Sequence, residues 1–285
     1  MRLALTLLST LLLALGACAG GRPARQGPVG APVQAKGAHA ETPAAEAYTG
    51  KMIYVVVALC DNVNQGIVPV PAALGDGEDP ARNLYWGARF SVKTFFGASR
   101  EWQLLSAVQN PTPKVLERLV FKHRREEALL VADAYRGAEI KAATSDFLDA
   151  AAGLSGATAE VGGKTYNLSR GGASHMIAYV GHNGLMDFRL PRRPKGRQGD
   201  ARRDAVILAC ASKGYFADAI KESGANPLLW TTNLMAPEAY VLKAAVDGWL
   251  AGEGGEQVRE RAARQYHAYQ KCGLGAARRL FATGW

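Results

Sequence analysis

Two segments of the chain end an apolar run with a side chain suited to covalent catalysis. Residues 176–181 lead into His182, and residues 205–209 lead into Cys210. In a parallel α/β sheet, ligands and chemistry gather just beyond the carboxyl ends of the strands. If both runs are strands of one sheet, an imidazole and a thiol meet at the same edge. A thiol nucleophile with a histidine base is suited to acyl transfer.

The surroundings of the two residues favour this chemistry. Cys210 precedes Ala211-Ser212-Lys213-Gly214, a turn into a helix, where unpaired amides favour the thiolate. The glycines on either side of His182-Asn183 let the backbone approach a ligand closely. A lone cysteine is more often simply buried, and a lone histidine is more often a loop residue. The pair favours catalysis because nucleophile and base would converge.

Five apolar runs predict the strands that position these residues. They cover 52–60, 128–133, 176–181, 205–210 and 227–232. Helical patterns cover 81–97, 138–152, 214–222, 237–250 and 255–270, with Pro237 expected at the first helical position. Strands that alternate with helices predict a mainly parallel sheet covered on both faces, an α/β fold of three layers, α/β/α. A small hairpin is expected around Gly162-Gly163.

The N-terminus predicts export and anchoring. Arg2, an apolar stretch over 3–15 and Leu15-Gly16-Ala17-Cys18 are typical of a signal peptide over 1–17. The last four residues resemble a bacterial lipobox, which implies lipidation of Cys18 and attachment to the membrane through that lipid. Ala19 in the next position favours the periplasmic face of the outer membrane. The alternative is an ordinary secretory signal in which Cys18 is incidental.

Behind the anchor, the composition indicates a tether and one domain. Residues 18–48 are rich in Ala, Gly, Pro and Gln and have no apolar period, which is typical of a flexible segment. Residues 49–285 are expected to form a single folded domain. The chain has a formal net charge of +9, which could attract nucleic acid. No helix-turn-helix, zinc or RNA-recognition pattern is present, so no nucleic acid partner is expected.

Cysteine usage is compatible with a free nucleophile. Without Cys18, the chain has Cys60, Cys210 and Cys272, an odd number, so one thiol stays unpaired if no bridge forms between chains. A disulfide between Cys60 and Cys272 would leave Cys210 free, but the sequence leaves that pairing open. No group of His and Cys has the spacing of a zinc site, so we expect no metal and no cofactor.

The two blocks that end in His182 and Cys210 resemble those of the caspase-like clan of cysteine peptidases, which includes caspases, legumains, gingipains and the catalytic subunit of GPI transamidase. Gly181-His182-Asn183-Gly184 is most similar to the legumain and GPI-transamidase branch. The resemblance covers about residues 50–235 and implies a caspase-like sheet. It also implies that Cys210 is the nucleophile and that His182 polarises the substrate or shuttles its proton.

The resemblance also implies roles for residues at neighbouring strand ends. The amides of Asn183 and Gly184 are expected to hold the oxyanion, although the clan usually has glycine where this chain has Asn183. Further substrate contacts are expected from residues after the first, second and fifth strands: Asp61, Asn64, Arg136 and Asn233. Asp61 would favour a basic substrate residue and Arg136 an acidic one, and the sequence does not choose. Each of these residues is otherwise suited to a turn.

The leading hypothesis is an envelope-anchored cysteine peptidase or transpeptidase that acts on peptides or proteins with a Cys-His dyad. The alternative keeps the fold without the chemistry, as a catalytically inactive caspase-like lipoprotein that binds peptide or a partner protein; Asn183 favours it. A serine hydrolase is a third class, but the chain has no Gly-x-Ser-x-Gly elbow to support it.

Overall fold

The computed structural model describes residues 45–169, 175–196 and 203–285. The predicted signal peptide, Cys18 and most of the predicted tether lie outside the described residues. The domain takes in residues before 49, because Glu46 forms a bridge with Tyr166. Tyr48 is buried, and its ring meets that of Tyr166 edge to face. No helix in the described part of the chain is both long enough and apolar enough to cross a bilayer.

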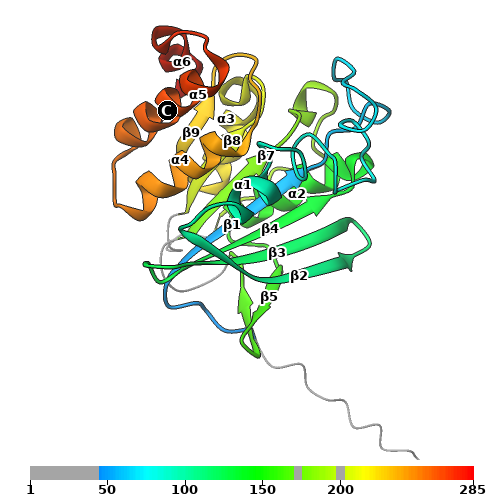
Figure 1. Cartoon of the computed structure of the whole chain (residues 1–285), viewed down its shortest axis with the longest axis vertical. Helices are drawn as coiled ribbons and strands as arrows, with labels where there is room; N and C mark the ends of the chain where they lie inside the picture. The colour runs from blue at the N-terminus through cyan, green and yellow to red at the C-terminus, as the bar shows by residue number, and fades with distance from the viewer. Residues whose placement is uncertain (1–44, 170–174, 197–202) are drawn as a thin grey trace, which may run out of the picture. The chain divides into compact units, whose positions relative to one another are not determined.

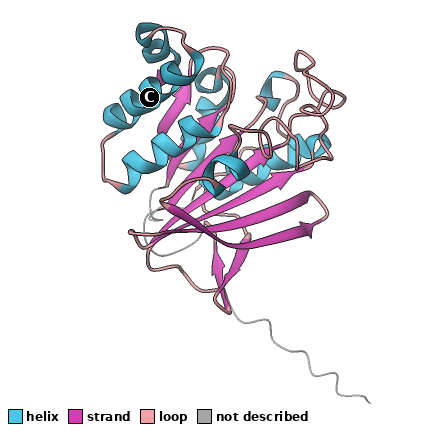
Figure 2. Ribbon diagram, in the orientation of Figure 1, coloured by secondary structure: helices cyan, strands magenta, loops and turns pink. Residues whose placement is uncertain are grey.

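Strand β1 (Lys51–Ala58) is buried on both of its faces. Successive side chains of a strand point to opposite faces, and those of β1 accordingly enter two separate cores. Ile53, Val55 and Val57 pack with helices α1 (Val92–Gly97), α4 (Ala239–Leu250) and α5 (Gly255–Gln270). Met52, Tyr54 and Val56 pack with α2 (Ile140–Ala151) and α3 (Ser212–Ser223). The sheet therefore lies between two helical layers, as expected (Figure 2).

The sheet has eight strands, and its centre is parallel. The parallel strands run in the order β9 (Asn226–Thr231), β8 (Asp204–Leu208), β7 (His175–Val180), β1, β4 (Ala128–Tyr135) (Figure 1). Antiparallel β10 (Phe281–Ala282) adds to β9, and antiparallel β3 (Val115–His123) and β2 (Trp102–Thr112) extend the other side.

The chain reverses its direction of travel across the sheet at β1. From β1 it moves to one side to form β4, then crosses back to form β7, β8 and β9 on the other side. The topological switch point therefore lies between β1 and β7. In open α/β sheets, ligands bind outside the carboxyl ends of the strands at such a point. His182 follows β7 directly at this position.

The five predicted strands are all present, with ends that differ by one or two residues. The helices expected over 138–152, 214–222 and 255–270 are confirmed as α2, α3 and α5, and a single 3-10 turn, Gly137–Glu139, precedes α2. The expected hairpin is also confirmed, as β5 (Thr158–Val161) and β6 (Lys164–Asn167). The sequence reading did not include the β2–β3 hairpin, α6 (Leu274–Leu280) or β10.

The helix expected over 81–97 is wrong except for its last turn and a half, α1. Buried Asn83 bonds to the backbone of a distant segment instead: its side chain accepts from Cys60 N and donates to Cys60 O, at 3.0 and 2.8 Å. Gly87 approaches the carbonyl oxygen of Ala81 so closely that a Cβ there would lie 2.1 Å from it. Pro237 is likewise not the first helical residue, since α4 begins at Ala239 with Glu238 as its N-cap.

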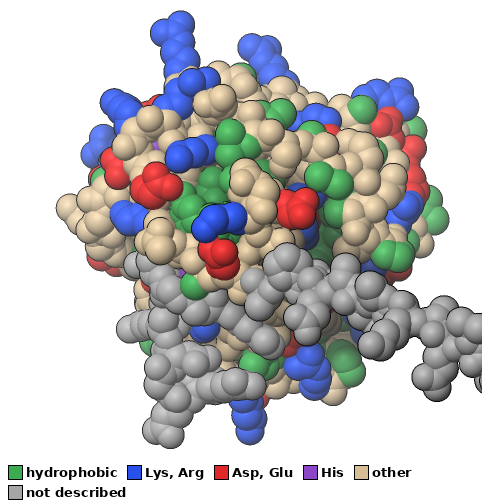
Figure 3. Space-filling model, turned by 90° about the horizontal axis from the view of Figure 1, so that it is seen from below, with side chains coloured by type: hydrophobic (Ala, Val, Ile, Leu, Met, Phe, Trp, Pro, Cys, Tyr) green, Lys and Arg blue, Asp and Glu red, His purple; other side chains and the backbone are tan. Residues whose placement is uncertain are grey.

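Charged groups are distributed over the surface. On the face seen from below, basic and acidic side chains are interspersed, both at the rim and toward the middle (Figure 3). Among the described residues, the ion pair of Arg118 and Asp133 is largely buried. Arg118 donates to both carboxylate oxygens at 2.6 Å, and Tyr54 donates to the same carboxylate at 2.9 Å. Asp133 is fully buried. Burial and the charge of Asp133 raise the pKa of Tyr54 well above its ordinary value.

Replacing Arg118 by Met should leave the buried Asp133 charge without its partner. We expect Arg118→Met to lower the free energy of unfolding by about 3 kcal/mol, measured by urea denaturation. Arg125→Met is the matched control, because its ion pair with Glu101 is exposed, and it should change stability by less than about 0.5 kcal/mol. Equal losses in the two variants would contradict this account of the Arg118–Asp133 pair.

Candidate active site

The register between β7 and β8 places His182 and Cys210 at matching positions. Val180 is paired with Leu208, and the ladder continues through a hydrogen bond from Gly181 N to Leu208 O at 3.2 Å. His182 and Cys210 each stand two residues beyond that last pair. Neighbouring strands lie about 4.8 Å apart, so the two residues leave the sheet side by side. The strand ends that carry His182 and Cys210 are therefore neighbours, as the sequence predicted.

The thiol of Cys210 is half-buried and held by the backbone of Met235. Met235 N donates to Sγ at 3.4 Å, and Sγ donates to Met235 O at 3.6 Å. Two tyrosines lie near the thiol, Tyr85 and Tyr266. Burial is the largest cause that raises the pKa of each hydroxyl, and for Tyr85 the neighbouring Cys60 adds to it. Both hydroxyls therefore stay neutral at ordinary pH.

The turn after Cys210 is strained and firmly held. Ala211 has φ +48°, in the left-handed region, and its N–H donates to Asn233 O at 2.9 Å. Ser212 and Thr231, both fully buried, exchange hydrogen bonds: Ser212 N to Thr231 Oγ1 at 3.1 Å and Thr231 N to Ser212 Oγ at 2.9 Å. Since β9 thus fixes the turn from β8 into α3, the direction of the thiol is set by the sheet.

The imidazole of His182 is oriented by an acidic residue that the sequence analysis did not identify. Nε2 of His182 lies 2.7 Å from Oδ2 of Asp187, which also accepts from Gly66 N at 2.9 Å. A carboxylate only accepts, so the proton of a neutral imidazole lies on Nε2 and Nδ1 keeps its lone pair. The 3-10 turn Gly184–Met186 returns the chain onto His182. An acidic residue five positions after the histidine was the available signal.

Asn183 joins the loop of the histidine to that of the cysteine. It is fully buried; its Nδ2 donates to Cys210 O at 2.6 Å, and its Oδ1 accepts from Leu185 N at 3.1 Å. Within the described chain, the N–H groups of Cys210, Asn183 and Gly184 donate no hydrogen bond to the protein. Gly184 is required here, because a Cβ would lie 2.6 Å from the ring of Phe188. These three amides therefore have no protein acceptor among the described residues.

The structure does not bring all the predicted substrate contacts together. Asp61 is buried and accepts from the backbone of Val63 and Asn64 at 2.8 and 3.0 Å, and from Asn64 Nδ2 at 2.8 Å. Asp61 and Asn64 thus stabilise the turn that follows β1 through hydrogen bonds within that turn. Arg136 pairs with Glu78 and donates from Nε to Pro113 O at 2.8 Å. Asn233, by contrast, is bonded to the turn that carries Cys210.

The three cysteines of the described chain are all free thiols, so the pairing of Cys60 with Cys272 does not occur in this structure. Cys60 is buried, and burial raises the pKa of its thiol to about 11. Cys272 is exposed. No cluster of three or more His, Cys, Asp or Glu residues suited to a metal ion exists in the described ranges. Searches of protein-family models, curated proteins and solved structures found no match to this chain.

Relieving the strain at Ala211 should stabilise the protein. Glycine adopts a left-handed conformation without the steric cost that a Cβ carries. Ala211→Gly is expected to raise the free energy of unfolding by about 0.5–1 kcal/mol in urea denaturation, net of backbone entropy. Ala217→Gly, within α3, is the control and should lower it by about 1 kcal/mol. A loss in both variants would show that the turn is unstrained.

The thiols should differ in their reaction with iodoacetamide. Because the thiolate is the reactive form, the raised pKa and burial of Cys60 should keep it unmodified in the native protein at pH 7–9, while Cys272 reacts. Unfolding in urea should make Cys60 react as well. Peptide mapping by mass spectrometry gives the extent at each site, and rapid native labelling of Cys60 would contradict the buried position.

Proposed function

We propose that this protein is a cysteine peptidase or transpeptidase that works by thiol acyl transfer. The observation that carries the proposal is the position of His182 and Cys210, each two residues past the paired ends of β7 and β8, with β7 bordering the switch point of the sheet. The resemblance of these two blocks to the caspase-like clan supports the same assignment. Peptides or proteins are the proposed substrates.

The chemistry follows from the groups at this edge. The thiol of Cys210 passes its proton to Nδ1 of His182. The Sγ thiolate then attacks the carbonyl carbon of the scissile bond, and the electron pair of the C=O bond moves to oxygen. The amides of Cys210 and Asn183 are suited to donate to that oxyanion. Protonated Nδ1 of His182 then gives its proton to the leaving nitrogen as the C–N bond breaks, which leaves a thioester on Sγ.

The second half of the reaction restores the thiolate. Water attacks the thioester carbon and passes a proton to Nδ1 of His182, and the C–S bond breaks to release the acid. If a substrate amine attacks in place of water, it passes its proton to Nδ1 in the same way, and the product is a new peptide bond. Asp187 acts as a positioning residue throughout, because it keeps the proton of the ring on Nε2 and turns Nδ1 toward the reaction.

We further propose that the domain is tethered to the envelope by a lipid on Cys18, at the periplasmic face of the outer membrane. The basis is the lipobox-like Leu15-Gly16-Ala17-Cys18 and the Ala19 that follows it. The peptidase would then meet extracytoplasmic peptides. A serine in place of Cys18 should release the protein from the membrane fraction.

A specific observation favours a second candidate, a lipoprotein that binds peptide without cleaving it. Asn183 replaces the usual glycine, and its side chain is bonded to Cys210 O. In the described residues no hydrogen bond joins Sγ of Cys210 to the His182 ring. Apo sites often have long catalytic contacts that tighten with substrate, so the two candidates need a direct test.

That test is site-mapped alkylation across pH, in a Cys272→Ser background so that Cys210 is the accessible thiol. We expect Cys210 to react fast near neutral pH, and His182→Ala to slow it by about tenfold or more, because a neighbouring imidazolium favours the thiolate. His267→Ala, a half-buried residue of α5, is the control and should leave the rate unchanged. An inert Cys210, or equal rates with and without His182, would favour the binding protein.

Activity gives the complementary measurement. In a peptide-library screen, Cys210→Ala should lower kcat/KM by about 10³-fold or more, since the nucleophile carries the reaction. Asp187→Asn should lower kcat more than it raises KM, because it disturbs the ring of His182 and not the bound peptide. Cleavage that persists at the wild-type rate in Cys210→Ala would exclude thiol acyl transfer.

A further inference from the structure

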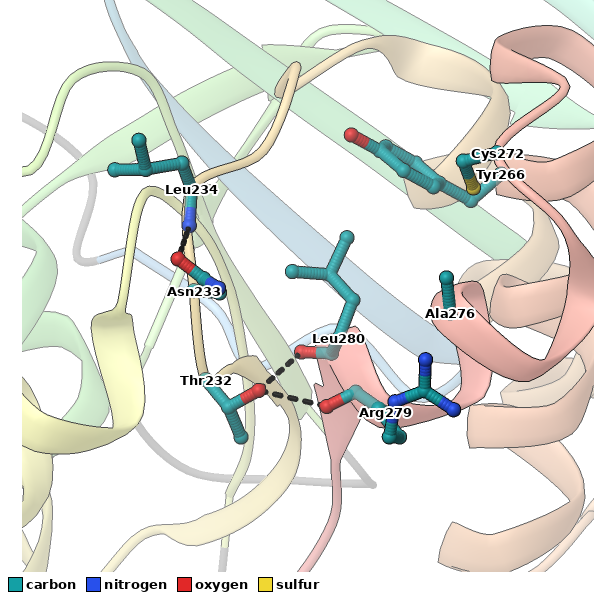
Figure 4. Close-up of a pocket in the computed structure, with 8 residues that line it drawn as sticks. All are labelled: Thr232, Asn233, Leu234, Tyr266, Cys272, Ala276, Arg279 and Leu280. Carbon is teal, nitrogen blue, oxygen red and sulfur yellow. Dashed lines mark hydrogen bonds between the residues drawn. The ribbon is translucent and has the colours of Figure 1, made fainter.

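A cavity of about 500 Å³ opens beside the turn that carries Cys210. It lies between the connection after β9 and the C-terminal helices α5 and α6 (Figure 4). One wall comes from Thr232, Asn233 and Leu234, and the other includes Tyr266, Arg279 and Leu280. Its volume is in the range of pockets that hold small ligands or side chains.

The cavity and the thiol share one stretch of backbone. Asn233, in the wall, accepts from Ala211 N at 2.9 Å, immediately after Cys210. Two residues further on, Met235 contacts Sγ through its N–H and its carbonyl. Tyr266, in the opposite wall, is joined to the same segment, because its hydroxyl accepts a hydrogen bond from Ala236 N at 3.2 Å. A group bound in the cavity therefore lies against the segment that holds the nucleophile.

The cavity has one cation and no acidic group in its lining. Arg279 is the only charged lining residue, and it forms no ion pair within the described residues. Its neighbour Arg278 is instead bound by both carboxylate oxygens of Glu260, at 2.7 Å each. The backbone of Arg279 is fixed by Thr232, whose Oγ1 donates to Arg279 O at 2.7 Å. An unpaired guanidinium on a fixed backbone is suited to a carboxylate.

We propose that this cavity is a specificity pocket that takes an acidic side chain of the substrate peptide. The carboxylate binds Arg279, and the aliphatic part of the side chain packs against Leu234 and Leu280. The proposal rests on the peptidase function proposed above, and it names the class of substrate for that site. Its recognising residue lies in α6, beyond the segment that resembles the caspase-like clan. Asp61 and Arg136, the alternatives expected from the sequence, are bound to their own loops.

Binding can be measured without catalysis because Cys272 lines the same cavity and is exposed. In the full-length Cys210→Ala variant, the rate of Cys272 alkylation by a maleimide reports whether the cavity is filled. The probes are three hexapeptide mixtures that differ only in a fixed Asp, Asn or Lys at one position. The Asp mixture should slow alkylation at the lowest concentration, and the other two should need about 10–100-fold more, the value of a charge-assisted hydrogen bond.

Two substitutions then test whether Arg279 is the residue that binds the acidic side chain. Arg279→Ala should remove the advantage of the Asp mixture, while Arg278→Ala on the same helix should keep it. Equal protection by Asp, Asn and Lys, or an Asp preference that survives Arg279→Ala, would overturn the acidic pocket. Near-identical urea unfolding curves for Arg279→Ala and Arg278→Ala are required, so that a change in binding is not a loss of folding.

Cleavage by the wild-type protein separates this inference from the proposed function. If peptides are cleaved without preference for an acidic residue and Cys272 is not protected, the result supports the peptidase function and overturns the acidic pocket. If the Asp mixture protects Cys272 but no peptide is cleaved, the result supports the acidic pocket and overturns the peptidase function in favour of a binding protein. Cleavage beside an acidic residue that depends on Arg279 supports both.

Discussion

The parallel ladder between β7 and β8 is the constraint on which the candidate site depends. It holds the ends of two strands at a fixed spacing and in register, so that the residues after Val180 and Leu208 emerge together. The ladder is stable because side chains on both faces are buried, in two cores that share the sheet. The two strand ends that carry His182 and Cys210 are therefore neighbours through the sheet itself.

Buried polar side chains complete what the ladder begins. Asn83, Asn183 and the Ser212–Thr231 pair each bond to the backbone of a different loop, and each is buried with its hydrogen bonds made. Fully satisfied networks of this kind rigidify a structure, whereas partly satisfied ones are costly. They fix the loops at the carboxyl edge and leave a few amide donors unpaired near Cys210. Rigid strands with held loops are the arrangement that precise positioning requires.

Much of the architecture could be predicted because it depends on local pattern. Continuous apolar runs marked the five parallel strands, and helical periodicity marked α2, α3 and α5. The β2–β3 hairpin was not predicted, because much of β2 is exposed and its sequence lacks a continuous apolar run. The helix expected over 81–97 failed because Asn83 bonds to the backbone of Cys60, a long-range contact that outweighs local propensity. Among site residues, Arg279 was missed because its cavity is built from segments far apart in the chain, and Asp187 was missed although it lies only five residues after His182.

The sequence by itself determined which residues stand at strand ends, since burial on both faces of a strand requires an unbroken apolar run that stops where the chain leaves the sheet. It thereby selected His182 and Cys210. Only the tertiary structure decided that β7 and β8 are neighbours, that Asp187 holds the imidazole, and that Arg279 faces a cavity beside the Cys210 turn while Asp61 and Arg136 do not. Strand order and loop contacts join residues far apart in the chain, and local composition carries no record of those pairings.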